Sequence, residues 1–286
     1  MLASFLITFR EALEAALIIG IIAAYIAKIG RKDLTRYINV GILGALVASL
    51  AVAMIFKTVY GELSGTAEQL FEGAAALTAA IVLTYMIFWM ANNSRQIKGE
   101  VQEKIDISIS KGQVFGIAAL SFIAVFREGV ETVLFLGTLA INGPFDTISG
   151  FIIGLATVIV LSFIMFKGTY RLDTGKFFRY TSFMLILFSA GLVATGVHEF
   201  NEAGIIPNGI EHVWDVNPAL NPDGTYPPLH ENGLIGGSFK ALIGYNGNPS
   251  LTEIMAYFGF WIIIGMFVLR TYKTGKVNNG SRYPQD

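Results

Sequence analysis

The sequence predicts an all-α protein that crosses a membrane seven times, and three observations lead to this prediction. Of the 286 residues, 53% are hydrophobic and only 14% are charged, whereas an average soluble domain has about 25% charged residues. The mean hydropathy is +0.59. Seven stretches are long and apolar enough to cross a hydrocarbon core of ~30 Å as helices. This composition excludes a disordered chain, a nucleic-acid-binding surface and an ordinary cytosolic enzyme.

The predicted spans follow one another closely, apart from one long connection. They cover residues 2–28, 36–57, 66–91, 113–141, 146–167, 177–199 and 251–271. The first span is too long for a removable signal peptide, and three charged residues interrupt the place of its apolar region. The long connection, 200–250, is rich in proline, glycine and asparagine. Such a composition predicts turns rather than a packed domain.

Lysine and arginine residues predict how the spans are oriented. Sixteen of the twenty lie in the connections after spans 1, 3 and 5 or in the C-terminal tail. Only Lys57 and Lys240 fall on the other side, and the last two basic residues lie inside spans. Because basic residues are retained on the cytoplasmic side, we expect a multi-pass protein of the cell membrane with its N-terminus outside.

An internal repeat relates the first three spans to the next three. Residues 4–14 align with residues 121–131 at an offset of 117, and six of the eleven positions are identical. Because a unit of three spans is odd, the second unit is predicted to be upside down, as in many secondary transporters. We therefore expect repeat one over 1–112, repeat two over 113–199, an extracytoplasmic loop over 200–250, and a seventh span with a cytosolic tail over 251–286. Rocking of one repeat against the other would alternate access.

Each repeat carries an Arg-Glu-x-x-Glu motif inside an apolar span. The motif residues are Arg10, Glu11 and Glu14 in the first span and Arg127, Glu128 and Glu131 in the fourth. Residues three and four apart share a helix face, and a charge at the bilayer centre costs at least ~2.5–3.5 kcal/mol. One alternative is purely structural: two arginine–glutamate pairs that lock helices together. However, each motif has one positive and two negative charges, so carboxylates remain unpaired and the two motifs sum to −2.

Further acidic residues and the histidines lie toward the outer side. Glu68 and Glu72 share a face of the third span. Candidates for outer metal capture are His198, Glu199, Glu202, Glu211, His212, His230 and Glu231. For the four of them in the long connection, the favoured interpretation is that they are ordinary polar loop residues. Carboxylates without thiolates favour a hard cation. The neighbouring arginines would keep the carboxylates ionised.

The chain contains no cysteine and no G-x-x-x-x-G-K-[ST] pattern. These absences exclude thiolate metal sites and disulfides and give no sign of a nucleotide site. The sequence therefore predicts a secondary carrier or a facilitated pathway without an organic cofactor, rather than an ATP-driven pump or an enzyme.

The paired motifs, the seven predicted spans and the glutamate-bearing segment Phe71-Glu72-Gly73 resemble the oxidase-dependent high-affinity iron permeases. That family includes fungal iron permeases and bacterial ferrous-iron-uptake permeases. The resemblance implies that iron is the transported substrate, ferric after oxidation outside by a separate multicopper oxidase or haem peroxidase. It also implies that Glu11, Glu14, Glu128 and Glu131 are the transport carboxylates, in the same motifs as Arg10 and Arg127.

Three alternatives remain open. A carrier for another metal, such as lead, would use the same architecture, and so would a proton-coupled exporter. An intramembrane carboxylate-metal oxidase is the alternative from another class, although di-iron bundles of that kind typically add Glu-x-x-His ligands, which no predicted span contains. Oligomeric state and coupling ion have no signature in the sequence.

Overall fold

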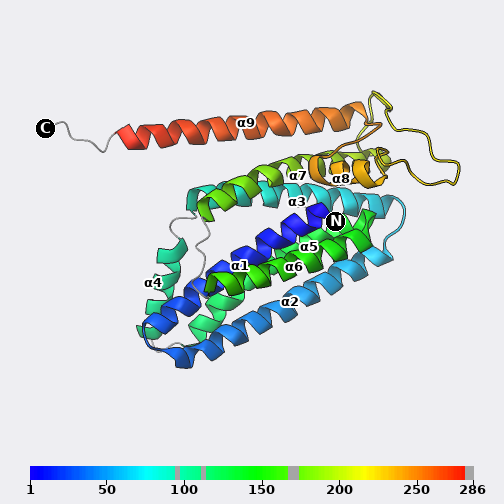
Figure 1. The fold of residues 1–286 in the computed structure, drawn as a ribbon. Coiled ribbons are helices and arrows are strands. Elements are labelled where there is room, and N and C mark those ends of the chain that lie inside the picture. Colours follow the sequence, from blue (N-terminus) through cyan, green and yellow to red (C-terminus); the bar gives the residue numbers. More distant parts are fainter. Residues whose placement is uncertain (94–96, 111–113, 167–173, 281–286) are drawn as a thin grey trace.

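The computed structural model describes residues 1–93, 97–110, 114–166 and 174–280, and in these residues it is all-helical, as predicted. Figure 1 shows long helices side by side in a bundle, with the C-terminal helix along one edge. Long helices are α1 (Leu2–Lys28), α2 (Thr35–Glu62), α3 (Thr66–Asn93), α5 (Phe115–Asn142), α6 (Pro144–Phe166), α7 (Thr174–Glu202) and α9 (Leu251–Gly280). Shorter elements are the 3₁₀ turn η1 (Lys32–Leu34), α4 (Ile97–Ser110) and α8 (Leu234–Ile243).

Four of the helices are long and apolar enough to cross a membrane by length and composition alone: α2, α3, α6 and α7. Only 17% of the most apolar stretch of α6 and 22% of that of α2 are buried, so these helices present apolar side chains outward, as a lipid-facing surface requires. Helices α1 and α5 fall outside this group because each carries an Arg-Glu-x-x-Glu motif. In α9 the apolar part among the described residues is Leu251–Phe267. The count of seven spans stays a prediction.

Two short helices were not predicted. The helix α4 lies in the connection after α3, and its Val101 and Ile105 are buried among apolar residues of α1, α2 and α5. The helix α8 interrupts the turn-rich connection before α9 and packs on α7. It ends at Gly244 in the left-handed conformation, φ 70°. A Cβ on Gly191 of α7 would lie 2.8 Å from the nitrogen of Gly244, so only glycine allows this close approach.

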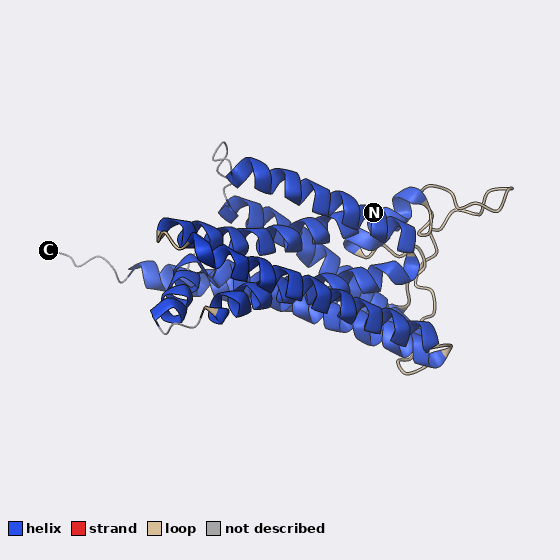
Figure 2. Cartoon of the chain, turned by 90° about the horizontal axis from the view of Figure 1, so that it is seen from below, coloured by secondary structure: helices blue, strands red, loops and turns tan. Residues whose placement is uncertain are grey.

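The helices pair across the two sequence halves. The most extensive packing joins α2 to α5, α3 to α7 and α1 to α6, and Figure 2 shows the bundle that results from below. In the first pair, Gly41 of α2 has no room for a Cβ because the carbonyl of Ala118 lies against it. In the third pair, Gly150 of α6 meets the carbonyl of Met1 in the same way. Met1 and Ala118 are 117 residues apart, which is the offset of the sequence repeat.

Aromatic pairs show the same equivalence. Phe5 and Phe9 of α1 stack with their ring centroids 5.7 Å apart. Phe122 and Phe126 of α5 stack at 5.2 Å, again at an offset of 117. The local packing of α1 is therefore repeated along α5.

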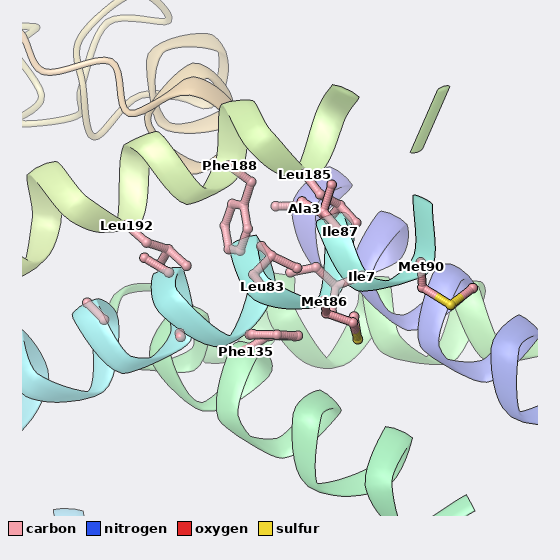
Figure 3. Packing of buried hydrophobic residues seen from close by; sticks show 13 residues of the cluster. Ala3, Ile7, Leu83, Met86, Ile87, Met90, Phe135, Leu185, Phe188 and Leu192 are labelled. Carbon is pink, nitrogen blue, oxygen red and sulfur yellow. The ribbon is translucent and has the colours of Figure 1, made fainter. Parts of the chain in front are cut away.

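Apolar side chains form two buried clusters, one on either side of the charged motif along α1. The first cluster includes Ile7 of α1 and draws on α3, α5 and α7 (Figure 3). The second includes Ile22 and Ile26 of α1 with residues of η1, α2, α4 and α5. Arg10, Glu11 and Glu14 lie between Ile7 and Ile22 in the sequence of α1, so apolar packing borders the motif toward both ends of the helix.

Candidate metal centre

The first Arg-Glu-x-x-Glu motif is fully enclosed. The side chain of Arg10 is 1% exposed, with Nη1 2.6 Å from Oε1 of Glu11 and Nη2 2.7 Å from Oε1 of Glu14. Both glutamates are buried as well. One guanidinium thus contacts two carboxylates, which leaves a net charge of −1 on this turn of α1.

The second motif has the same sequence pattern but a different geometry. Nε of Arg127 donates to Oε1 of Glu128 at 2.9 Å, and Nη2 contacts the same oxygen. The next pair is looser, because Nε of Arg127 lies 3.7 Å from Oε1 of Glu131, beyond hydrogen-bonding range. The side chain of Arg127 is 39% exposed, in contrast to that of Arg10.

Three carboxylates from the two motifs meet. Glu11 of α1 and Glu128 and Glu131 of α5 each offer one oxygen within 4.8 Å of the others. In each of the three, Oε2 is buried and has no hydrogen-bond partner among the described residues. A buried carboxylate oxygen without a donor is costly, and a cation bound among these three carboxylates would offset part of that cost. Glu14, the fourth glutamate of the motifs, does not belong to this group.

The third helix supplies a surface for both arginines. The sulfur of Met86 lies 3.8 Å from Nη1 of Arg10, and the ring centroid of Trp89 lies 5.3 Å from Cζ of Arg127. Met86 and Trp89 are three residues apart, so they share a face of α3. Neither residue was assigned to the site from the sequence, because an apolar residue in an apolar span carries no distinguishing signal.

A second group of acidic residues lies near the start of α3 and the end of α7, beside Tyr60 near the end of α2. The hydroxyl of Tyr60 donates to Oε1 of Glu72 at 2.8 Å and to Oε1 of Glu68 at 3.2 Å. Glu199 of α7 faces Glu72 at side-chain hydrogen-bonding range. Glu68, Glu72 and Glu199 are thus brought together. Tyr60, which the sequence did not predict as a site residue, contacts two of them.

His198 and Glu202, the other candidates on α7, differ in their surroundings. Nδ1 of His198 lies 3.2 Å from Oε1 of Glu253 at the start of α9. Asn246 donates to the other oxygen of Glu253 at 2.6 Å, so His198 belongs to a network that ties α9 to α7. Glu202 is exposed at the helix end.

The candidates in the 200–250 connection do not come together in one group. Glu211 and His212 are exposed, and Nδ1 of His212 lies 3.2 Å from the carbonyl of Asn248. Nδ1 of His230 accepts a hydrogen bond from the nitrogen of Asn232 at 3.1 Å. Glu231 accepts one from Gly247 at 2.9 Å and lies 3.7 Å from Lys240. His230 and Glu231 hold the loop in shape, which favours the structural interpretation of these two residues.

A bundle with lipid-facing apolar helices and a buried group of carboxylates defines the class of membrane carriers for hard cations. Comparison with known proteins then identifies the family. A family model described as "Iron permease FTR1 family" matches residues 1–277, and the chain belongs to this family. It is therefore a transporter of iron across a membrane rather than an enzyme, as the sequence predicted.

Individual relatives match over nearly the whole chain. A protein of Archaeoglobus fulgidus described as uncharacterized is 35% identical over 273 residues, which cover 95% of this chain and 96% of the relative. The "Ferrous iron permease EfeU" of Escherichia coli O6:H1 is 33% identical over 269 residues, covering 92% of this chain and 93% of the relative. The protein of the same name from Yersinia pestis is also 33% identical over 269 residues, covering 92% of this chain and 91% of the relative. No solved structure matches this chain.

Proposed function

We propose that this chain carries iron across the plasma membrane through a central site made of Glu11, Glu128 and Glu131. The observation that carries the proposal is the meeting of three carboxylates from two helices, each with a buried oxygen that lacks a donor. Ionisable groups inside a membrane mark ion pathways by default. Oxygen ligands of this kind suit iron as a hard cation. Glu14 then acts as the partner of Arg10 rather than as a direct ligand.

The inverted repeat is part of this proposal. Equivalent contacts of Gly41 and Gly150, at carbonyls 117 residues apart, support a pseudo-two-fold relation between α1–α3 and α5–α7. The exchange of partners, α1 with α6 and α2 with α5, is the pattern that such a relation generates. Transporters with inverted repeats bind their substrate where the repeats meet, which is where α1 and α5 bring their motifs together. The N-terminus lies outside in this arrangement, following the basic residues.

Iron would reach the centre by way of the outer acids. Glu68, Glu72 and Glu199, with the hydroxyl of Tyr60, form an oxygen-rich group at the outer ends of three helices. A negatively charged approach concentrates cations from solution. The ion then passes inward to the central carboxylates and leaves on the basic cytosolic side.

The charge of the central site bears on the valence of the ion. Two arginines and four glutamates sum to −2, which a ferrous ion neutralises fully, whereas a ferric ion leaves an excess of +1. The names of the bacterial relatives also specify ferrous iron. The resemblance seen in the sequence predicts the ferric ion instead, delivered by an extracytoplasmic oxidase. The ferrous ion is the form that the charge count favours at the centre, and the ferric route through an oxidase is the second candidate.

The test is uptake of radioactive iron into vesicles reconstituted with the purified protein. Uptake is measured with ferrous iron under a reductant and with chelated ferric iron, and lead is added as a competitor in a separate series. Glu131→Gln and Glu11→Gln should abolish uptake, because each removes a charged ligand without a large change in shape. Glu103→Gln is the matched control, since Glu103 is an exposed carboxylate on α4, outside the site.

Folding of each variant is checked by circular dichroism and by elution as a single species in detergent. Uptake at the wild-type rate in folded Glu131→Gln and Glu11→Gln would refute the central site. Faster uptake from the chelated ferric form than from the ferrous form would overturn the assignment of valence while leaving the site in place.

A further inference from the structure

The two motifs share the pattern Arg-Glu-x-x-Glu, yet the glutamate four residues after the arginine has different contacts in each. In α1, Glu14 forms an ion pair with Arg10 at 2.7 Å. In α5, the equivalent distance from Arg127 to Glu131 is 3.7 Å. Glu131 belongs to the three-carboxylate group and Glu14 does not. The two glutamates thus differ both in their distance from the arginine of their own motif and in whether they join the three-carboxylate group.

The difference coincides with what α3 places beside each arginine. Arg10 has the thioether of Met86 next to it and is enclosed. Arg127 has the face of Trp89 instead, with Cζ 5.3 Å from the ring centroid. A guanidinium within about 6 Å of an indole centroid is attracted to the ring, and tryptophan is the strongest aromatic partner for it. The indole therefore gives Arg127 a cation–π contact in addition to its contact with Glu128, whereas the neighbour of Arg10 on α3 is a thioether.

We propose that Trp89 is a positioning residue that holds Arg127 against Glu128 and thereby leaves Glu131 free to bind the transported ion. This inference rests on the proposed function. The guanidinium of Arg127 is held between the indole and Oε1 of Glu128. Without the indole, the guanidinium can close the gap to Glu131 and form the same pair that Arg10 forms with Glu14. A guanidinium that contacted Glu131 as well as Glu128 would compete with the ion for the Glu131 carboxylate, so the ion would bind more weakly.

The packing of Trp89 suits this role. Trp89 is partly buried and packs against the first apolar cluster. Leu83, Met86, Phe135 and Phe188 of this cluster are labelled in Figure 3. The ring of Trp89 is supported by this cluster and therefore offers Arg127 a fixed surface. The guanidinium of Arg127 is 39% exposed and is therefore less confined by its surroundings than the ring against which it lies.

The experiment measures ferrous iron binding to the purified protein by anaerobic calorimetry. Trp89→Leu should weaken binding by about 2- to 30-fold, the range that corresponds to the strength of a cation–π contact. Trp89→Phe keeps an aromatic face and should weaken binding less. Trp261→Leu on α9 is the matched control, since Trp261 packs among aromatic residues of its own helix.

A double-mutant cycle separates positioning from simple packing. In an Arg127→Gln background, Trp89→Leu should cause no further loss, because the residue through which Trp89 acts has gone. The same loss in both backgrounds, or wild-type affinity in Trp89→Leu, would overturn the role of Trp89. If Trp89→Leu does not fold, the comparison is made with Trp89→Phe, whose smaller loss must likewise vanish in the Arg127→Gln background.

The outcome for the central site is read separately. Loss of binding in Glu131→Gln together with wild-type binding in Trp89→Leu refutes only the positioning role. Wild-type binding in Glu131→Gln refutes the central site itself, whatever the result at Trp89.

Discussion

Replacing the two motif arginines should have unequal effects on stability, although their sequence contexts match. In Arg10→Gln, the guanidinium that contacts Glu11 at 2.6 Å and Glu14 at 2.7 Å is lost from a site that water does not reach. Removing one member of a buried ion pair costs about 3–5 kcal/mol. In Arg127→Gln, water can approach because the side chain is 39% exposed. The expected cost is roughly 1–2 kcal/mol, between the ranges for buried and exposed pairs.

The free energies of unfolding are compared in mixed micelles by denaturant titration with far-ultraviolet circular dichroism, in the presence of a metal chelator. Arg36→Gln is the control, because Arg36 is exposed on α2 and surface substitutions usually change stability by less than about 0.5 kcal/mol. Equal losses for the Arg10 and Arg127 variants, or a larger loss for Arg127, would refute the reasoning from burial.

Two further substitutions test packing and the outer acids. Gly41→Ala should destabilise the bundle by about 1–3 kcal/mol through overpacking, because its Cβ would meet the carbonyl of Ala118. Gly61→Ala is the control, since a Cβ at Gly61 of the same helix would have open space, and it should not destabilise the protein. Thermal unfolding of the two variants in detergent measures the difference. Tyr60→Phe removes the donor to Glu68 and Glu72 and should change the KM for iron uptake with little change in the maximal rate, since it alters the approach rather than the centre. An unchanged KM in reconstituted vesicles would contradict the proposed path.

The long helices could be predicted from the sequence because length and hydropathy decide them. The span predicted over 2–28 coincides with α1, Leu2–Lys28, and the span over 66–91 ends two residues before α3 does. The helices α4 and α8 were missed. The first mixes charged and apolar residues in one short stretch, and the second contains adjacent glycines that normally favour turns. In both, packing against the long helices overrides a weak local preference.

The central site was only partly predictable. The repeated motif pointed to Glu11, Glu128 and Glu131, because charges inside a span must face a polar partner. It could not separate Glu14 from Glu131, since the two occupy the same position of the shared Arg-Glu-x-x-Glu pattern. Their difference depends on what α3 places opposite each arginine, and that is a property of the assembled bundle. For the same reason nothing in the sequence singled out Trp89 or Tyr60.

The exchange of partners between the sequence halves has a mechanical consequence. Because α1 is joined to α6 and α2 to α5 more extensively than α1 is to α2, the expected rocking of one repeat against the other would have to separate the most extensively packed surfaces. A movement of the pair α3/α7 relative to the quartet α1, α2, α5 and α6 would leave these packed surfaces intact. Such a movement would shift Trp89 of α3 relative to Arg127 of α5. The conformational change of the transport cycle would then be coupled to the affinity of the site for the cation.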